Sequence, residues 1–485
     1  MTPQSAGPDR RWLILGVLGI AQLMVVLDAT IVTIALPSAQ RALHFAAAER
    51  QWIITAYALA FGSLLLLGGR LSDLFGRKRT LIAGLVGFAI ASAAGGAAQS
   101  FGTLAAARVC QGACGALLAP SALSLLTTTF TDETERARAF GVFSALAAGG
   151  ASIGLLLGGV VTQFLSWRFS MFINLAFALV AVTGAVVLIP YSKPAEAIKI
   201  DVPGTLTACA GLFAIVFGFS RAQPDGWFSA LTIGMVVLGV ALLAAFARIE
   251  MAASRPLLPP RVLANRNRSG SFASIAIGAV AIFGVLLFLT YYLQQVRGYS
   301  PTLTGLAFLP MTATIVPAAV LGQTTLRARF SPRTLVATGM SLSGIGMLYL
   351  TRLGISSSYT SDVLPALIPI GIGTGLVIST SISNATRGVA QTDAGVASGM
   401  VNASQQVGGS LGTALLSTIA TSAAAHTLAE SPSGARASAV AAVHGFTVGF
   451  TWAAAIFALG AVVGLTVFPR QPTQASDTPA RPAVS

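Results

Sequence analysis

The composition of this 485-residue chain is typical of a protein that dissolves in lipid. Hydrophobic residues make up 54% of it and charged residues 9%, with a mean hydropathy of +0.79, whereas a soluble chain carries about 25% charged residues. The net charge of +14 does not indicate nucleic-acid binding, because the basic residues lie in short loops between apolar runs. The three cysteines have neither zinc-site spacing nor the pattern of a secreted disulfide framework.

Apolar segments long enough to cross a membrane, which takes about 20 residues, recur along the whole chain. The first is too long for the core of a signal peptide, so we interpret it as a membrane span. We predict an all-α integral membrane protein, and the short tails at both ends are expected to be disordered. The fourteen predicted transmembrane helices are 12–36, 51–69, 79–99, 103–128, 138–162, 168–190, 203–223, 228–248, 270–292, 303–325, 334–352, 362–384, 395–418 and 446–468.

The basic loops predict the orientation. With the N-terminus inside, the inside segments hold 21 of the 29 Lys and Arg residues, the outside segments hold 7, and Arg108 lies within a span. Cytoplasmic loops carry such an excess of positive charge. We therefore expect a multi-pass protein of the cytoplasmic membrane, with both termini in the cytoplasm.

Two stretches of the chain repeat at nearly the same offset. "RLSDLFGRKRTLIAG" (70–84) aligns with "TLRARFSPRTLVATG" (325–339) at an offset of 255, and "GVFSALAAGGASIGLLLG" (141–158) aligns with "GVASGMVNASQQVGGSLG" (395–412) at 254. Parallel six-helix repeats are typical of transporters that bind their substrate between the repeats. The predicted parts are a cytoplasmic N-terminal tail, a first half, a linker with a two-helix insert, a second half and a cytoplasmic C-terminal tail: 1–11, 12–190, 191–262, 263–468 and 469–485.

The loop "GGRLSDLFGRKR" (68–79) carries an acid among cations. Its glycines allow tight turns, and its spacing resembles the signature between helices 2 and 3 of the major facilitator superfamily. The resemblance implies a cytoplasmic gate, in which the acid and the cations part and meet again as the halves rock. The alternative is an ordinary basic inside loop. The gate residues are Gly69, Arg70, Asp73, Gly76, Arg77, Lys78 and Arg79.

Two ionisable residues lie deep within the predicted spans. Arg108, in "LAAARVCQG" (104–112), resembles the helix-4 element that proton-coupled members of the superfamily use in proton transfer. Asp28, in "LDATIVTIALP" (27–37), resembles the helix-1 element of the fourteen-helix drug:proton antiporters. Intramembrane charges normally have partners, and we expect these two to meet. The alternatives are a snorkelling arginine and an aspartate with a purely structural role.

Helix 5 carries a glycine strip, and further matches to the same antiporter branch cover about residues 12–468. The matching stretches include "WRFSMFIN" (167–174) and "NASQQVGGSLG" (402–412). Four positions depart from the usual pattern, namely Thr33 for asparagine, Leu155 for proline, Phe169 for tryptophan and Gln405 for a basic residue. A strip of small residues allows two helices to approach closely. Its members are Gly150, Gly154, Gly158 and Gly159.

The resemblance implies a proton-coupled antiporter that exports a lipophilic or cationic drug or antibiotic by alternating access. A buried carboxylate beside an arginine can gain and lose a proton as its surroundings change, and a cationic substrate could compete for it. No phosphate-binding loop occurs. We expect no enzyme activity, no metal and no cofactor other than the proton gradient; the partners are a small amphiphile, protons and membrane lipid, and the protein is expected to work as a monomer.

The substrate cavity is expected between helices 1, 2, 4 and 5 and their counterparts in the second half. Segment 303–325 has no acid, which favours monovalent or neutral amphiphiles over divalent cations. Two other classes remain open, a proton-coupled uptake symporter for a small metabolite and a non-transporting membrane scaffold or sensor. The cavity candidates are Gln22, Tyr57, Gln111, Tyr292, Gln295, Asn384, Asn402 and Gln406.

Overall fold

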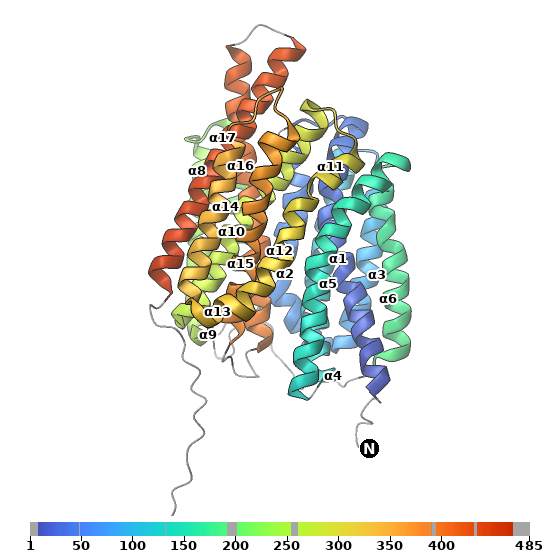
Figure 1. Cartoon of the computed structure of the whole chain (residues 1–485). Helices are drawn as coiled ribbons and strands as arrows, with labels where there is room; N and C mark the ends of the chain where they lie inside the picture. The colour runs from blue at the N-terminus through green and yellow to red at the C-terminus, as the bar shows by residue number, and fades with distance from the viewer. Residues whose placement is uncertain are drawn as a thin grey trace, which may run out of the picture.

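The computed structural model describes residues 8–47, 49–130, 132–191, 201–253, 260–387, 389, 394–430 and 434–468. These residues form a bundle of long helices and contain no strand (Figure 1). The two tails beyond this part, 1–7 and 469–485, lie outside the described residues, and so does most of the linker, 192–200.

Every predicted span coincides with a helix or a string of helices. The segment predicted at 303–325 is interrupted at Phe308, and three short π-helical turns (η) interrupt or precede other helices. The elements are α1 Pro8–Leu43, α2 Arg50–Phe75, α3 Arg77–Gly96, α4 Phe101–Thr129, α5 Glu133–Phe164, α6 Phe169–Leu188, α7 Val202–Asp225, α8 Ala230–Ala252, α9 Pro260–Ala264, α10 Arg266–Tyr291, η1 Tyr292–Val296, α11 Pro301–Ala307, α12 Leu309–Leu321, η2 Gly322–Leu326, α13 Arg327–Arg329, α14 Pro332–Leu350, η3 Tyr359–Val363, α15 Leu364–Thr386, α16 Ala394–Ala429 and α17 Ala435–Val467.

Most of these helices suit a lipid environment. Among the described residues, eleven helices are long and apolar enough to cross a membrane. A helix satisfies all of its backbone hydrogen bonds internally, which the lipid core requires. The remaining three predicted spans, in α2, α5 and α14, are helical as well, but the count of fourteen crossings stays a prediction.

Helix α1 begins at Pro8, inside the predicted N-terminal tail. Proline is well tolerated in the first turn of a helix, and contacts with other helices hold this turn. Arg10 Nε donates to the carbonyl of Leu188 at 3.2 Å, and Arg11 Nη1 donates to Glu135 Oε2 at 3.1 Å. The tail is therefore shorter than the sequence predicted.

The helices of each half pack mainly on one another. Helix α1 packs on α5 and α6, and α2 packs on α4, while in the second half α12 packs on α15 and α10 on α16. The insert helix α7 lies against α8, α16 and α2, so it contacts both halves. In Figure 1 the first half lies on the right and the yellow-to-red second half on the left.

We call the end of the bundle where α1 begins the terminal face and the end where α1 stops the opposite face (Figure 1). Two side-chain hydrogen bonds join the halves at the opposite face. Gln294 Nε2 donates to the carbonyl of Ile34 at 3.0 Å, and the Thr302 amide donates to Gln163 Oε1 at 3.2 Å. The halves are therefore held together at the opposite face.

A buried arginine adds to this junction. Arg50 opens α2, and its guanidinium lies 4.2 Å from the ring centre of Tyr291 on α10 and 5.9 Å from that of Phe446 on α17. Only 8% of the arginine is exposed. A cation above an aromatic face is attracted by the ring quadrupole, so this contact stabilises the closed opposite face.

Candidate functional site

Asp28 of α1 and Arg108 of α4 form an ion pair inside the first half. Arg108 Nη1 donates to Asp28 Oδ2. The side chain of Asp28 is 0% exposed and that of Arg108 is 1% exposed. Their meeting was expected from the sequence, and the low exposure of Arg108 excludes the snorkelling alternative for this conformation. Removing either partner of such a pair strands a buried charge, which costs about 3–5 kcal/mol.

Polar side chains from three helices complete the surroundings of the carboxylate. Asp28 Oδ1 accepts from Gln111 Nε2 at 2.9 Å and from Asn174 Nδ2, on α6, at 2.7 Å. Both amides also donate to the hydroxyl of Ser92 on α3, at 2.7 and 3.3 Å. All three of these side chains are buried. We call Asp28, Arg108, Gln111, Asn174 and Ser92 the charge network.

The arginine is held from a fourth direction by α2. Arg108 Nε donates to the carbonyl of Ile53 at 3.0 Å, Nη1 donates to Gln111 Oε1 at 2.9 Å, and the guanidinium lies 4.3 Å from the ring centre of Tyr57. The Tyr57 hydroxyl is buried and has no hydrogen-bond partner among the described residues. The arginine is thus fixed by backbone, amide and aromatic contacts besides the carboxylate.

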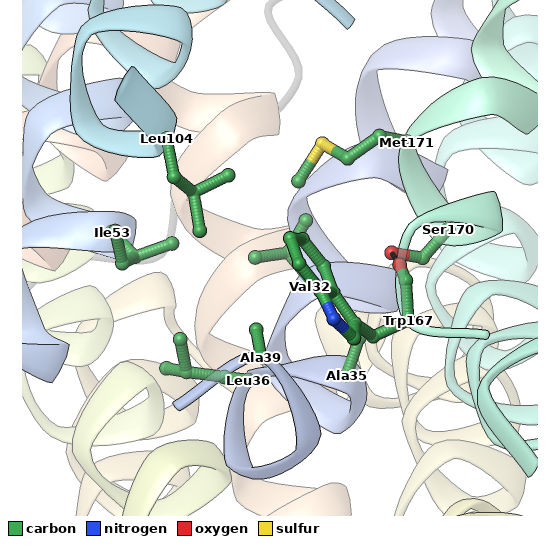
Figure 2. Close-up of a pocket in the computed structure, with 9 residues that line it drawn as sticks. All are labelled: Val32, Ala35, Leu36, Ala39, Ile53, Leu104, Trp167, Ser170 and Met171. Atoms are coloured by element: carbon green, nitrogen blue, oxygen red, sulfur yellow. Dashed lines mark hydrogen bonds between the residues drawn. The ribbon is translucent and has the colours of Figure 1, made fainter. Parts of the chain in front are cut away.

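An apolar layer separates the charge network from the opposite face. Val32 and Leu36 follow Asp28 on α1 and line a cavity of about 10 Å³ together with Leu104 and Trp167 (Figure 2). Such a volume holds about one water molecule. The cavity is therefore far too small for a drug, and its apolar wall shields the carboxylate from that face.

In the predicted gate, glycine is required at Gly76. Its φ of +92° between α2 and α3 is a conformation that residues with a Cβ rarely adopt. Lys78 Nζ donates to the carbonyls of Val186 and Ile189 at 2.8 and 2.6 Å, at the end of α6, where a cation is stabilised by the helix dipole.

The other gate residues lie around this turn. Arg79 stacks on the ring of Tyr191 at 4.9 Å, so two of the four cations contact the first half itself. Gly69 and Arg70 lie in the last turns of α2, and Arg77 opens α3. The side chain of Asp73 lies outside the described part of the chain, so the latch stays a prediction.

The glycine strip of α5 lies along α1. A Cβ at Gly158 would come 3.0 Å from Ile31 Cα, and one at Gly150 would come 2.8 Å from Leu23 Cδ1; Gly154 faces Thr30. Gly159 points across to the second half, where a Cβ would come 2.6 Å from the Pro301 carbonyl oxygen. Three glycines therefore serve packing within one half, and the fourth serves the contact between halves.

The structure distributes the predicted cavity residues over several places. Tyr57 and Gln111 belong to the surroundings of the ion pair, whereas the Tyr292 hydroxyl donates to the Gly354 carbonyl at 2.8 Å near the opposite face. Asn384 lies at the terminal end of α15 beside Arg327. The remaining four are half-buried or exposed on α1, η1 and α16: Gln22, Gln295, Asn402 and Gln406. A cavity lined by all eight stays a prediction.

Sequence reasoning missed two members of the charge network, Asn174 and Ser92. The sequence predicted only the pair of Asp28 and Arg108 for this place, whereas these two further members come from α6 and α3. A signal was present for Asn174, because it ends the family-like stretch "WRFSMFIN" in an otherwise apolar helix. Ser92 has no such signal, since an isolated serine in a spanning helix is common.

Comparisons with known proteins agree with this architecture. The family model "Major Facilitator Superfamily" matches residues 18–413. The puromycin resistance protein pur8 of Streptomyces alboniger is 46% identical over 98% of this chain and 96% of its own, and the cephamycin export protein CmcT of Amycolatopsis lactamdurans is 37% identical over 82% and 83%.

Solved structures agree in fold. The inward-facing, unoccupied crystal structure of a bacterial homolog of the human lysosomal transporter Spinster has a TM-score of 0.65 at 16% identity, over 95% of this chain and 98% of the other. The family match and the close relatives together settle the classification. This chain belongs to the major facilitator superfamily.

Proposed function

We propose that the protein is a proton-coupled antiporter that exports a lipophilic or cationic antibiotic from the cytoplasm. The observation that carries the proposal is the ion pair of Asp28 and Arg108, in which both side chains are almost completely buried. Intramembrane ionisable residues of this kind mark ion pathways and proton relays. The cargo class rests on relatives that are named for resistance to puromycin and export of cephamycin.

The orientation follows from the charge of the loops, which places the terminal face in the cytoplasm. The structure is then in a state closed to the outside, because the joined opposite face is the outer one. When the halves separate there, water reaches the apolar layer around Val32 and Trp167, and a proton can enter from the outside. Rocking back then delivers the proton to the cytoplasm.

Coupling in this proposal is indirect. The oxygens of Asp28 are occupied by Arg108, Gln111 and Asn174, and the carboxylate is 0% exposed. A cationic substrate therefore does not compete for Asp28 in this conformation. Protonation instead removes the negative charge that holds Arg108, and the freed guanidinium rearranges its contacts with α2 through Tyr57 and Ile53. Helix α2 packs on α16 of the second half, so the change can reach the interface between halves.

Accumulation of puromycin or a lipophilic cationic dye in an efflux-deficient bacterial host tests the proposal. Cells that produce the protein should retain less compound than control cells until a protonophore collapses the gradient, and Asp28→Asn should abolish the difference. An uptake symporter would raise the cellular content instead. A lowered content that persists with the protonophore would contradict proton coupling.

A further inference from the structure

A second arginine of the structure is held in an unusual way. Arg327 follows η2 at the terminal face. Its Nη1 donates to Gln323 Oε1 at 2.9 Å and to Ser383 Oγ, and its Nη2 donates to Asn384 Oδ1 at 3.3 Å. All three acceptors are neutral, and the arginine makes no ion pair with any described residue. Intramembrane charges normally pair with one another or with backbone carbonyls, whereas no described carboxylate pairs with this arginine.

The three bonds leave two of the N–H donors of the guanidinium unused. Arginine has five N–H donors in a planar fork, and the three contacts use both donors of Nη1 and one of Nη2. The Nε–H and the second Nη2–H remain. Two parallel N–H groups of this kind fit two oxygens of a carboxylate or phosphate. The three neighbours thus hold the fork in place and leave it ready for an oxyanion.

Further donors surround the same place. Asn384 is 8% exposed, and its Nδ2 is buried without a partner among the described residues, as is Nε2 of Gln323. Arg387 adds a second positive charge close to Arg327. Several donors, positive charge and no acid among the described residues favour a negatively charged acceptor.

The position of Arg327 suits a lipid headgroup. Val316 and Val320 of α12 lie eleven and seven residues before the arginine, and they are 44% and 54% exposed. An apolar helix face that ends in a cation is found at the membrane boundary. Basic pockets between spanning helices at the cytoplasmic side bind lipid phosphates.

In the first half, the position equivalent to Arg327 packs without a cation. The repeat offset of 255 places Ser72 of α2 at the position of Arg327. Ser72 is buried and accepts a hydrogen bond from Ser121 of α4 at 3.1 Å. Helix α4 packs on α2 as α15 packs on α12. A small hydroxyl therefore fills the equivalent place, and the arginine has a different role.

We propose that Arg327, with Gln323, Ser383 and Asn384, forms a binding site for a phosphate oxyanion, supplied by an anionic lipid headgroup or by free phosphate. The site lies in the second half, remote in sequence from the charge network, and does not depend on proton coupling. Occupation of the site links the end of α12 to α15 through the ligand and the Asn384 amide.

Native mass spectrometry of the purified protein tests the lipid source. Wild type should bind phosphatidylglycerol saturably and in preference to phosphatidylcholine, and Arg327→Gln should weaken this binding about tenfold or more. Arg327→Lys keeps the charge but lacks the fork, so its binding should also be weaker than that of wild type. Arg329→Gln, which removes an exposed cation two residues away, should bind as wild type does.

Free phosphate is tested in nanodiscs of phosphatidylcholine alone. Inorganic phosphate should raise the melting temperature of wild type and not that of Arg327→Gln if the small ion can fill the site. A lipid preference without a phosphate effect assigns the site to headgroups, and a phosphate effect alone assigns it to the free ion. Absence of both effects would overturn the proposal. Equal losses in Arg327→Gln and Arg329→Gln, or an unchanged Lys variant, would overturn it too.

Discussion

Asn174 offers a sharp test of the charge network because it donates to Asp28 from α6, outside the elements of α1 and α4 that carry Asp28 and Arg108. In Asn174→Ala the carboxylate loses the donor at 2.7 Å, and the Ser92 hydroxyl loses the donor at 3.3 Å. A hydrogen bond to a charged group contributes about 1.5–3 kcal/mol. The ionised carboxylate should therefore lose stabilisation of this size in the variant.

The direction of the expected change follows from the hydrogen bond between Asn174 and Asp28. The Asn174 amide donates to Asp28 and therefore stabilises the ionised carboxylate. Without this bond the carboxylate has one donor fewer, and less proton should be released on substrate binding than from wild type. Gln111 still donates to the same oxygen at 2.9 Å, so we expect a loss of stabilisation at the lower end of the range, about 1.5 kcal/mol.

The assay is proton release from purified protein in detergent on addition of a transported compound, measured across acidic and alkaline pH. Ser170→Ala is the matched control. Ser170 is buried and lies one turn before Asn174 on α6, but its hydroxyl donates to the backbone carbonyl of Trp167 and not to Asp28. A profile of Asn174→Ala that coincides with those of wild type and Ser170→Ala would refute the role of Asn174.

Four further substitutions test the glycine strip of α5, the junction between the halves at the opposite face and the turn between α2 and α3. Gly158→Ala places a Cβ 3.0 Å from Ile31 Cα within the first half, so it should lower the melting temperature by an amount that reflects about 1–3 kcal/mol; an unchanged melting temperature would contradict the close contact. Gly159→Ala meets the Pro301 carbonyl of the second half and should shift spin-label distances across the opposite face toward separation, with Gly158→Ala as its control. Arg50→Gln removes a cation–aromatic contact of about 0.5–2 kcal/mol and should shift the same distances in the same direction, whereas the exposed Arg41→Gln should not. Gly76→Ala strains a φ of +92° by about 1–2 kcal/mol, and an unchanged melting temperature would show that the turn relaxes.

Hydropathy predicted the helices well because each span must be apolar on its own. The meeting of Asp28 and Arg108 was also predictable, since their depths follow from helix length. Asn174 and Ser92 were not, because no local pattern tells which faces of α3 and α6 point at α1. That depends on how six helices pack, which is a property of the whole half.

Arg50 and Arg327 show the same limit. From the sequence, Arg50 is one of several basic residues near the predicted outer loops, and Arg327 belongs to a basic inside loop. The structure buries Arg50 on Tyr291, a residue far away in the chain, and it places Arg327 among neutral acceptors of η2 and α15. Counting the basic residues of each loop predicts on which side of the membrane the loop lies. Whether a given arginine pairs with a carboxylate depends on how helices distant in the sequence pack.

The central claim, that Asp28 carries the coupled proton, is tested most directly with Asp28→Asn. Substrate-induced proton release is measured on the purified variant and wild type, with binding of the same compound followed separately. We expect the variant to bind the compound but to release no proton, because an amide does not titrate and its single oxygen can replace only one of the two accepting carboxylate oxygens. Release equal to that of wild type would contradict it.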